Sequence, residues 1–269
     1  MCASIATSIV SADALSLVRF GLRAADDPRI LNTVQVIDAL LKVETPLGPC
    51  WHRYNDDGYG EQADGAPFEG TGIGRAWPLL TGERAHYELA AGRRDRAAEL
   101  MRAMEGFANE SGLFPEQVWD APDLPDRGLF RGRPSGSAMP LVWAHAEYVK
   151  LRRSLQEGRV YDMPSAAAQR YLVERRTSPR VIWAYNNKAR SLPAGKILRI
   201  HLLSPARVHW SADGWQTAHD DATHDSGLSI HFVDLPTGAL SAGSQVAFTF
   251  YWTDAARWEG ANFSVAVTG

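Results

Sequence analysis

Apolar residues in the first part of the chain recur at every third or fourth position, which is the spacing of helices that pack on one side. This pattern predicts helical hairpins within residues 1–165. A short basic helical stretch follows at 166–176, and the linker is expected at about 158–178. The expected helices are 15–22, 30–41, 75–91, 95–108 and 137–155.

The hydrophobic period changes to two in the last hundred residues, as in half-buried strands. Gly, Pro, Asn and Asp separate these segments at roughly ten-residue spacing, which is typical of an antiparallel sandwich. We therefore expect a multi-domain α and β protein, with an antiparallel β-sandwich at 178–269. The expected strands are 181–185, 196–203, 207–210, 228–233, 245–252 and 264–267.

Two loops between the expected helices are unusually long. They cover about 45–74 and 112–136 and are rich in Gly, Pro and aromatic residues. Loops of this length are uncommon in compact domains unless they carry function. The pattern therefore indicates a working face at one end of the helical hairpins.

Overall charge and hydropathy exclude two classes of partner. The formal net charge is −3, which argues against a nucleic-acid partner, since such a partner requires a basic face. No apolar run reaches the length of a transmembrane helix, so no membrane partner is expected. The first thirteen residues contain no basic region, and no signal peptide is recognised there.

The segment GLFPEQVWD at 112–120 places Glu116 after a proline and among bulky apolar residues. A residue in that position is expected in a loop, where a partly desolvated carboxylate can act as a general acid or base. A surface glutamate beside a core tryptophan is the other interpretation of the same residues.

The segment WHRYNDDGYG at 51–60 alternates aromatic rings with charged hydrogen-bonding groups. Such a mixture suits a sugar, because rings stack on its C–H face while charged groups bind its hydroxyls. Asp56 and Asp57 together could also bind Ca²⁺, but ligand spacing does not support a calcium site, and a solvated turn is a further alternative. We expect no metal and no cofactor.

The glycine-rich segment at 70–74 lacks the Lys-Ser/Thr pair and the preceding strand of a phosphate loop. Glycines at the start of a helix instead indicate that the backbone of this segment comes close to a ligand. Arg75 and Trp77 would then face a pocket.

Taken together, these segments resemble glycoside hydrolase family 15, the glucoamylase and glucodextranase family. The resemblance covers about residues 12–155 and rests on four stretches in this order: RYNDDGYGEQADG (53–65), GTGIGRAWPLLTGERAHYELAAG (70–92), FPEQVWD (114–120) and SGSAMPLVWAHAEYVKL (135–151). The family is inverting and has an (α/α)6 barrel. The resemblance therefore implies that 1–165 form about half of such a barrel.

The resemblance also implies roles for residues of the long loops. It makes Glu116 the general base, and Ser137 the residue that supports this base or its water. Arg53 and Asp57, spaced as R-x-x-x-D, would bind substrate hydroxyls.

The resemblance gives three further substrate-binding candidates, one in the stretch 53–65 and two in the stretch 70–92. Trp77 resembles a tryptophan that forms a platform for the sugar. Arg75 and Tyr59 are the other two substrate-binding candidates.

The general acid of the family lies upstream of the R-x-x-x-D segment, and this chain has no glutamate before residue 44. We therefore expect the C-terminal half of a barrel that is inactive alone and has the missing N-terminal half as its partner.

The substrate implied is an α-glucan oligosaccharide or polysaccharide, cleaved by a glucan 1,4-α-glucosidase (glucoamylase)-type enzyme. A glucodextranase-type α-1,6 hydrolase is the alternative. The parent enzyme is expected in the periplasm or outside the cell.

Five of the nine tryptophans lie in the sandwich. Trp215 follows an Asp-Gly turn and Trp258 lies in a loop, as in starch-binding modules, so both are expected to contact sugar, with Asp213 and Asn262 as polar partners. A carbohydrate-binding module with a remnant helical region is therefore an alternative function for the chain. A sandwich that packs against the barrel and binds no sugar remains possible.

Overall fold

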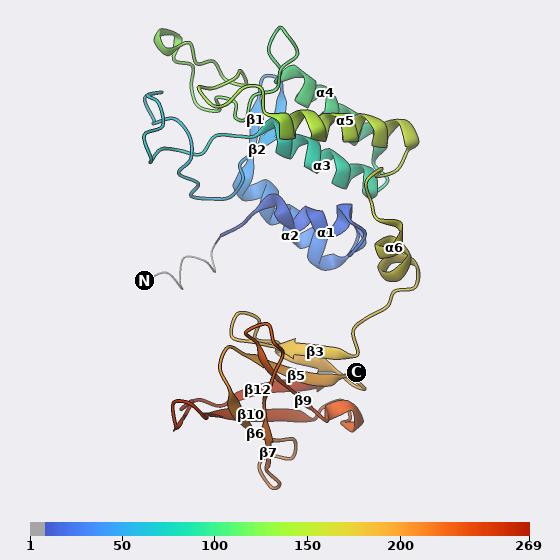
Figure 1. Ribbon diagram of the computed structural model, residues 1–269. Helices are drawn as coiled ribbons and strands as arrows, with labels where there is room; N and C mark the ends of the chain where they lie inside the picture. The colour runs from blue at the N-terminus through green and yellow to red at the C-terminus, as the bar shows by residue number, and fades with distance from the viewer. Residues whose placement is uncertain (1–8) are drawn as a thin grey trace. The chain divides into compact units, whose positions relative to one another are not determined.

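The structure is a computed structural model that describes residues 9–269, so the start of the segment considered for a signal peptide, and of the expected 1–165 domain, lies outside the described residues. The chain forms two compact units that divide between Arg176 and Thr177. Figure 1 shows a helical unit followed along the chain by a unit of strands. Each unit is described by itself below.

Helices α3, α4 and α5 form the centre of the first unit, where α3 packs against both of the others (Figure 1). A short 3-10 helix, Ala12–Leu15, leads into α1, and a β-hairpin follows α2. The elements of this unit are α1 (Ser16–Arg19), α2 (Pro28–Leu41), β1 (Lys42–Thr45), β2 (Gly48–Trp51), α3 (Pro78–Ala90), α4 (Arg94–Gly106), α5 (Val142–Glu157) and α6 (Ser165–Ala168).

Helix starts in this unit follow from proline and from capping. Asp27 caps α2 by accepting from the N–H of Arg29, and Pro28 occupies the first turn. Helix α3 begins at Pro78 rather than at the expected residue 75, because a residue before proline disfavours helical geometry. Trp77 accordingly has φ −109° and ψ 117°.

Helix α5 begins at Val142, five residues later than expected. The residues before it are not helical, and they bond to the loop that carries Glu116. The N–H of Glu116 donates to the carbonyl of Ala138, and the N–H of Leu141 donates to that of Phe114. This long-range pairing replaces the predicted first helical turn.

A buried ionic network fixes α5 to α3 and α1. Arg19 donates to both oxygens of Glu147 at 2.9 Å, and Nδ1 of His86 lies 2.7 Å from the same carboxylate. Gly82 makes room for it, since a Cβ there would lie 2.7 Å from Cγ of Glu147. Helices α3 and α5 are therefore held together by charge as well as by apolar packing.

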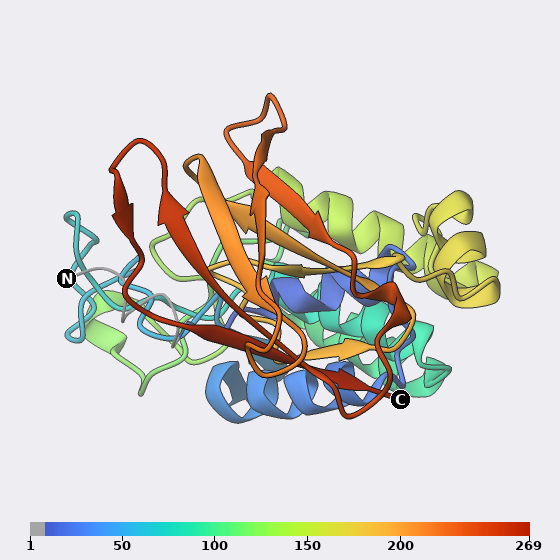
Figure 2. The same ribbon diagram turned by 90° about the horizontal axis from the view of Figure 1, so that it is seen from below.

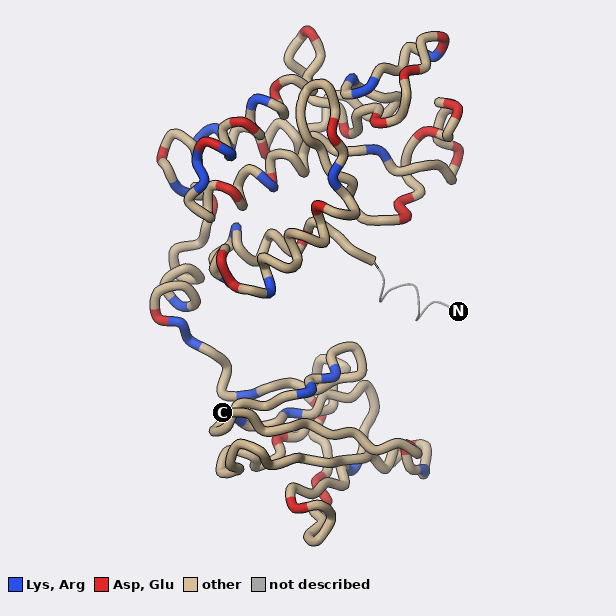
Figure 3. The backbone as a smooth tube through the Cα atoms, turned by 180° about the vertical axis from the view of Figure 1, so that it is seen from behind, with Lys and Arg blue, Asp and Glu red and all other residues tan. Residues whose placement is uncertain are grey.

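Both long loops leave the same end of these helices. One runs from β2 to α3 and the other from α4 to α5. Figure 3 shows acidic residues recurring along both loops. The hairpin β1–β2 occupies the start of the first predicted loop, which is therefore shorter than expected.

The second unit is a sandwich of two sheets, whose strands run side by side from orange to red in Figure 2. One sheet has the order β4-β12-β10-β6-β7 with β11 paired to β10, and the other has the order β3-β5-β9-β8. Its strands are β3 (Arg180–Trp183), β4 (Ser191–Pro193), β5 (Ile197–Leu202), β6 (Ala206–Ser211), β7 (His219–Ala222), β8 (His224–Asp225), β9 (His231–Leu235), β10 (Gln245–Trp252), β11 (Arg257–Trp258) and β12 (Phe263–Thr268).

The sandwich differs from the expected antiparallel one in two pairings. Strands β3 and β5 pair in parallel, and so do β12 and β4. Four short strands of two to four residues each, β4, β7, β8 and β11, were not predicted. Trp183, Phe248 and Phe250 fill the core between the sheets, each at most 1% exposed.

Candidate functional site

A cavity of about 510 Å³ lies between the two long loops of the helical unit. The first loop contributes Tyr59, Glu61 and Phe68, and the second contributes Glu116 and Ser137. Of the predicted site residues, Tyr59, Glu116 and Ser137 therefore line one cavity, although they are far apart along the chain. Four others do not line it: Arg53, Asp57, Arg75 and Trp77.

Glu116 is fixed at the wall of this cavity by its neighbours in the chain. The Oγ of Ser137 accepts from the N–H of Gln117 at 2.9 Å and donates to the carbonyl of Gln117 at 3.3 Å. Val118 forms an antiparallel β-bridge with Ala76 on one side and another with Pro134 on the other. The segment around Val118 therefore runs between the segments around Ala76 and Pro134. The backbone around Glu116 is thus held from both sides.

The Glu116 carboxylate is half-buried and accepts from the hydroxyl of Tyr59 at 3.2 Å. The charge of Glu116 raises the pKa of Tyr59, so the phenol stays a hydrogen-bond donor. The carboxylate keeps capacity for further hydrogen bonds, because an ionised carboxylate accepts about four. A water molecule in the cavity could use one of these positions.

Arg53 and Asp57 form a two-point ion pair beside this carboxylate. The two hydrogen bonds measure 2.8 and 2.9 Å. Burial alone would raise the pKa of Asp57, but the hydrogen bonds from Arg53 and from the N–H of Tyr59 outweigh it and hold the pKa below its usual value. The guanidinium also lies 4.8 Å from the ring centre of Trp77 and 5.0 Å from that of Tyr59.

Arg75 is buried rather than exposed to the cavity, with only 3% of its surface accessible. Its guanidinium contacts Asp120 at 3.2 Å, stacks on Trp119 at 4.0 Å, and donates to the main-chain carbonyls of Glu61 and Gln62. Arg75 therefore ties the two loops together behind the cavity wall.

Trp77 is also buried, at 4% exposure, and lines a separate cavity of about 210 Å³ together with Arg53 and Glu83. Burial raises the pKa of Glu83 to about 7, and the charge of Glu147 adds to this effect. Tyr59 links the two cavities, because its ring centre lies 6.5 Å from that of Trp77.

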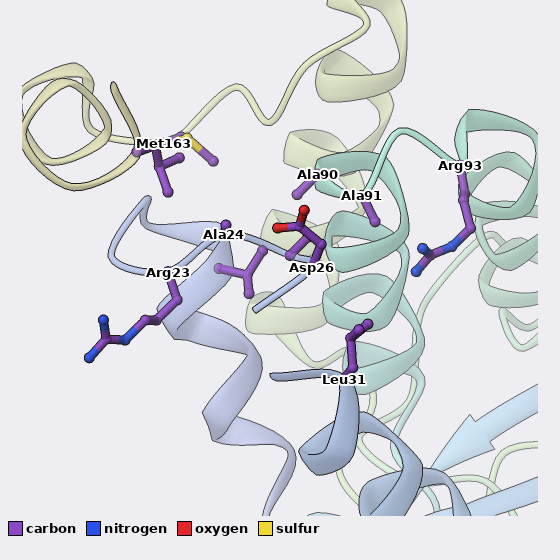
Figure 4. Close-up of a pocket in the computed structure, with 11 residues that line it drawn as sticks. Arg23, Ala24, Asp26, Leu31, Ala90, Ala91, Arg93 and Met163 are labelled. Carbon is purple, nitrogen blue, oxygen red and sulfur yellow. The ribbon is translucent and has the colours of Figure 1, made fainter. Parts of the chain in front are cut away.

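Another cavity, of about 360 Å³, lies at the far end of α3 and is shown in Figure 4. Ala90 and Ala91, at the end of that helix, line it together with Arg23, Asp26 and Arg93. None of the predicted site residues reaches it.

Two buried polar residues of the Glu116 cavity were not predicted from the sequence. Gln117 is 1% exposed, accepts from the N–H of Arg75 and donates to the carbonyl of Tyr59. Glu61 is buried and lines the cavity. Glu61 lies four residues after Asp57, in a loop that was already expected to carry function. No local pattern distinguishes it from an exposed loop glutamate, so the sequence could not identify it as a cavity residue.

Comparison with known proteins identifies the helical unit. The sequence model of "Glycosyl hydrolases family 15" matches residues 4–153. The chain belongs to this family. The predicted resemblance is thereby confirmed.

Two relatives within family 15 show what the chain is similar to. The glucoamylase of Clostridium sp. (strain G0005) is 51% identical over 166 residues, which are 62% of this chain and 22% of that protein. A crystal structure of bacterial glucoamylase complexed with acarbose matches with a TM-score of 0.56 and 51% identity, over 61% of this chain and 23% of that one. The chain thus spans about a quarter of the length of these relatives. The expected fold class, part of a helical barrel followed by a β domain, is confirmed.

Beyond the family 15 match, the sandwich brings Trp215 and Trp258 together on one sheet. His209 of β6 stacks on Trp215 at 5.2 Å and meets Trp258 edge-on at 5.8 Å. Nδ1 of His209 lies 3.1 Å from Asp220, and Tyr251 lies 5.4 Å from Trp258. Trp215 is 39% exposed and Trp258 is 48% exposed. Their rings lie on two sides of His209 and form an exposed aromatic surface, which we call the Trp215–Trp258 corner.

Asp213 is an exposed residue of the turn that leads to Trp215. Its carboxylate accepts from the N–H of Thr217 and from the hydroxyl of Ser211, and the same hydroxyl oxygen accepts from the N–H of Trp215. These bonds hold Trp215 at φ +68°, which a non-glycine residue rarely adopts. Asp213 therefore fixes the turn, and His209 is a polar group that contacts both rings.

Within residues 9–269, no group of three or more His, Cys, Asp or Glu side chains is arranged to hold a metal ion. Over the same residues, no helix combines the length and apolar character needed to cross a membrane.

Proposed function

We propose that this chain carries the general-base side of an inverting α-glucan hydrolase of the glucoamylase type, with Glu116 as the base. The observation that carries the proposal is the Glu116 carboxylate, which faces a cavity of about 510 Å³ and is held by Tyr59 and by the Ser137–Gln117 contacts. An inverting hydrolase needs a carboxylate that activates water on the face opposite the leaving group. The 51% identity to a glucoamylase supports this assignment.

In this proposal the neighbouring residues bind and orient the sugar. The Arg53–Asp57 pair binds hydroxyls at two points, since both partners are already fixed before the ligand arrives. Tyr59 supplies an aromatic surface near that pair, while the buried Trp77 packs against the Arg53 guanidinium. Ser137 positions Glu116 through the backbone, and Arg75 holds the loops without touching sugar.

The leaving group needs a second carboxyl, which acts as the general acid. We propose that polypeptide outside these 269 residues supplies it, because the chain spans only 22% of the Clostridium glucoamylase. The chain alone is then expected to release no glucose. A substrate of this polymeric kind places the whole enzyme in the periplasm or outside the cell.

The test is complementation. The chain is mixed with the part of the Clostridium glucoamylase that lies outside the match, and glucose release is measured from maltotriose and from isomaltotriose. Release of β-glucose, seen by NMR, supports an inverting hydrolase, and the faster substrate decides between α-1,4 and α-1,6 linkages. Glu116→Gln is expected to lose at least about a thousandfold in kcat, while Glu110→Gln in the exposed loop keeps full activity.

Two results contradict the proposal. Glucose release by the 269-residue chain alone would place the acid within it. An unchanged rate for Glu116→Gln in the mixture would remove Glu116 from the reaction.

A second function, carbohydrate binding by the sandwich, rests on the Trp215–Trp258 corner around His209. Aromatic faces beside a polar group suit a glucose ring. Calorimetry of the full chain with amylose and with dextran tests it. Trp215→Ala with Trp258→Ala is expected to abolish binding, whereas Leu228→Ala, which is 78% exposed, leaves it unchanged. Equal binding by the double variant would leave the sandwich with a packing role only.

A further inference from the structure

Glu61 is a buried acid in the wall of the Glu116 cavity whose hydrogen bonding is incomplete. The residue is 5% exposed and lines the cavity. Its Oε2 atom is fully buried and accepts no hydrogen bond from the described residues. Buried polar groups are nearly always hydrogen-bonded, so such an exception requires an explanation.

The neighbouring cation does not complete this hydrogen bonding. Nε of Arg75 lies 3.9 Å from Oε2 of Glu61, which balances the charge but is too long for a hydrogen bond. Arg75 is not free to move closer, because its other nitrogens bond to Asp120 and to the carbonyls of the Glu61 loop. Its guanidinium also stacks on Trp119.

The backbone around Glu61 is equally fixed. Its carbonyl accepts from the N–H of Ile73 at 3.1 Å, where two segments of the first loop cross at Gly60 and Gly72. A Cβ on Gly72 would lie 1.9 Å from the carbonyl oxygen of Gly60, so this crossing requires glycine. Glu61 is therefore presented to the cavity from a rigid loop.

The other carboxylate oxygen, Oε1, lies beside a glycine of the second loop. A Cβ on Gly136 would come within 3.0 Å of it. Because Gly136 has no side chain and itself lines the cavity, the approach to Oε1 from the cavity side is open.

We propose that Glu61 is a substrate-binding carboxylate, which accepts a hydrogen bond from a hydroxyl group of the sugar in the Glu116 cavity. The inference rests on the proposed function, since the ligand it requires is the same glucan. It assigns to Glu61 a role in specificity. A site built to bind a hydroxyl rejects an analogue that lacks it, because the buried acceptor is then left unpaired.

The first experiment measures binding of acarbose by calorimetry to the complemented enzyme described above. The chain carries Trp215→Ala and Trp258→Ala, so that binding by the sandwich does not contribute. Glu61→Gln is expected to weaken acarbose binding at least about tenfold. The control is Glu69→Gln, an exposed acid of the same loop that does not line the cavity, and it is expected to bind as the parent does.

The second experiment separates a direct contact from a structural role. Values of kcat/KM are measured for maltose and for its monodeoxy analogues. One analogue is expected to lose at least about tenfold with the parent chain and to lose nothing further with Glu61→Gln. A role in loop structure alone would instead lower all substrates equally.

If circular dichroism shows that Glu61→Gln does not fold, Gly136→Ala replaces it, because the added methyl group fills the approach to Oε1 and keeps the carboxylate. Weaker acarbose binding by this variant supports the proposal, and unchanged binding overturns it. Equal binding by folded Glu61→Gln and its parent overturns the role of Glu61 alone. A parent that neither binds acarbose nor releases glucose overturns the proposed function, and the role of Glu61 falls with it.

Discussion

Glu83 offers a direct test of the electrostatics of the helical unit. It lies on α3, one turn after the start of the helix, and faces the cavity that Trp77 lines. No described side chain hydrogen-bonds to its carboxylate, and the nearby Glu147 is paired with Arg19. Burial, followed by the negative charge of Glu147, raises the pKa of Glu83 from its usual 4.5 to about 7.

The sign of the effect on stability follows from proton binding. Between about pH 4.5 and 7 the folded unit holds this proton more tightly than the unfolded chain does, so its stability falls as the pH rises through that range. Above about pH 7 both states are ionised and the destabilisation is complete. A shift of this size corresponds to about 3 kcal/mol, and a buried glutamine amide keeps part of the desolvation cost.

We therefore expect Glu83→Gln to stabilise the helical unit by about 1–3 kcal/mol at pH 8 and by almost nothing at pH 4. For a unit of this size that gain raises the midpoint of thermal unfolding by roughly 3–10 °C. The assay is unfolding followed by circular dichroism at 222 nm from pH 4 to 8, because this signal reports the helices rather than the sandwich. Glu110→Gln, in an exposed loop, is the control and should show no such trend. A difference between Glu83→Gln and the parent that does not change with pH would refute the reasoning.

Three further predictions concern single positions. Gly74→Ala places a Cβ 2.6 Å from the side chain of Asp57 and should destabilise the unit by about 1–3 kcal/mol in urea unfolding, while Gly58→Ala, with 3.7 Å to its nearest neighbour, should cost far less. Arg75→Lys keeps the charge but loses the stack on Trp119 and the three-way hydrogen bonding, so it should lower stability by about 2–3 kcal/mol, whereas exposed Arg131→Lys should not. The Cys50 thiol, fully buried with its pKa raised by burial to about 12, should react with maleimide in a Cys2→Ser chain only as fast as the unit unfolds, and rapid labelling of the folded chain would contradict this.

Local patterns were sufficient for the longer helices and for singling out Glu116. Helices α2 and α3 have clear helical spacing and a proline in the first turn, and Asp27 also caps α2. Glu116 could be singled out because Pro115 removes it from a helix interior. In each of these cases the signal lies within a few residues of the feature.

Features made by contacts distant in sequence could not be predicted. The stretch before α5 was expected to be helical but is irregular, because it bonds to the backbone around Glu116 some twenty residues earlier. Arg75 was expected to contact sugar, and only the fold shows Asp120 and Trp119 around it. His209 likewise carries no signal in the sequence, since Trp258 of β11 comes beside it only because β6 and β11 both pair with β10.

The outer faces of α2 and α5 lead to the last prediction. Val36 and Leu40 on α2 are 44% and 57% exposed, and Val142 and Val149 on α5 are 76% and 64% exposed. In a unit whose inner faces are well buried, such apolar faces are available to further polypeptide of the family 15 barrel. We expect the chain alone to self-associate in sedimentation at about 10–100 µM, and the complementing part of the Clostridium glucoamylase to suppress this. Val36→Gln with Leu40→Gln should make the chain monomeric, whereas exposed Leu228→Gln in the sandwich should not. A parent chain that stays monomeric throughout this range would show that these faces need no partner.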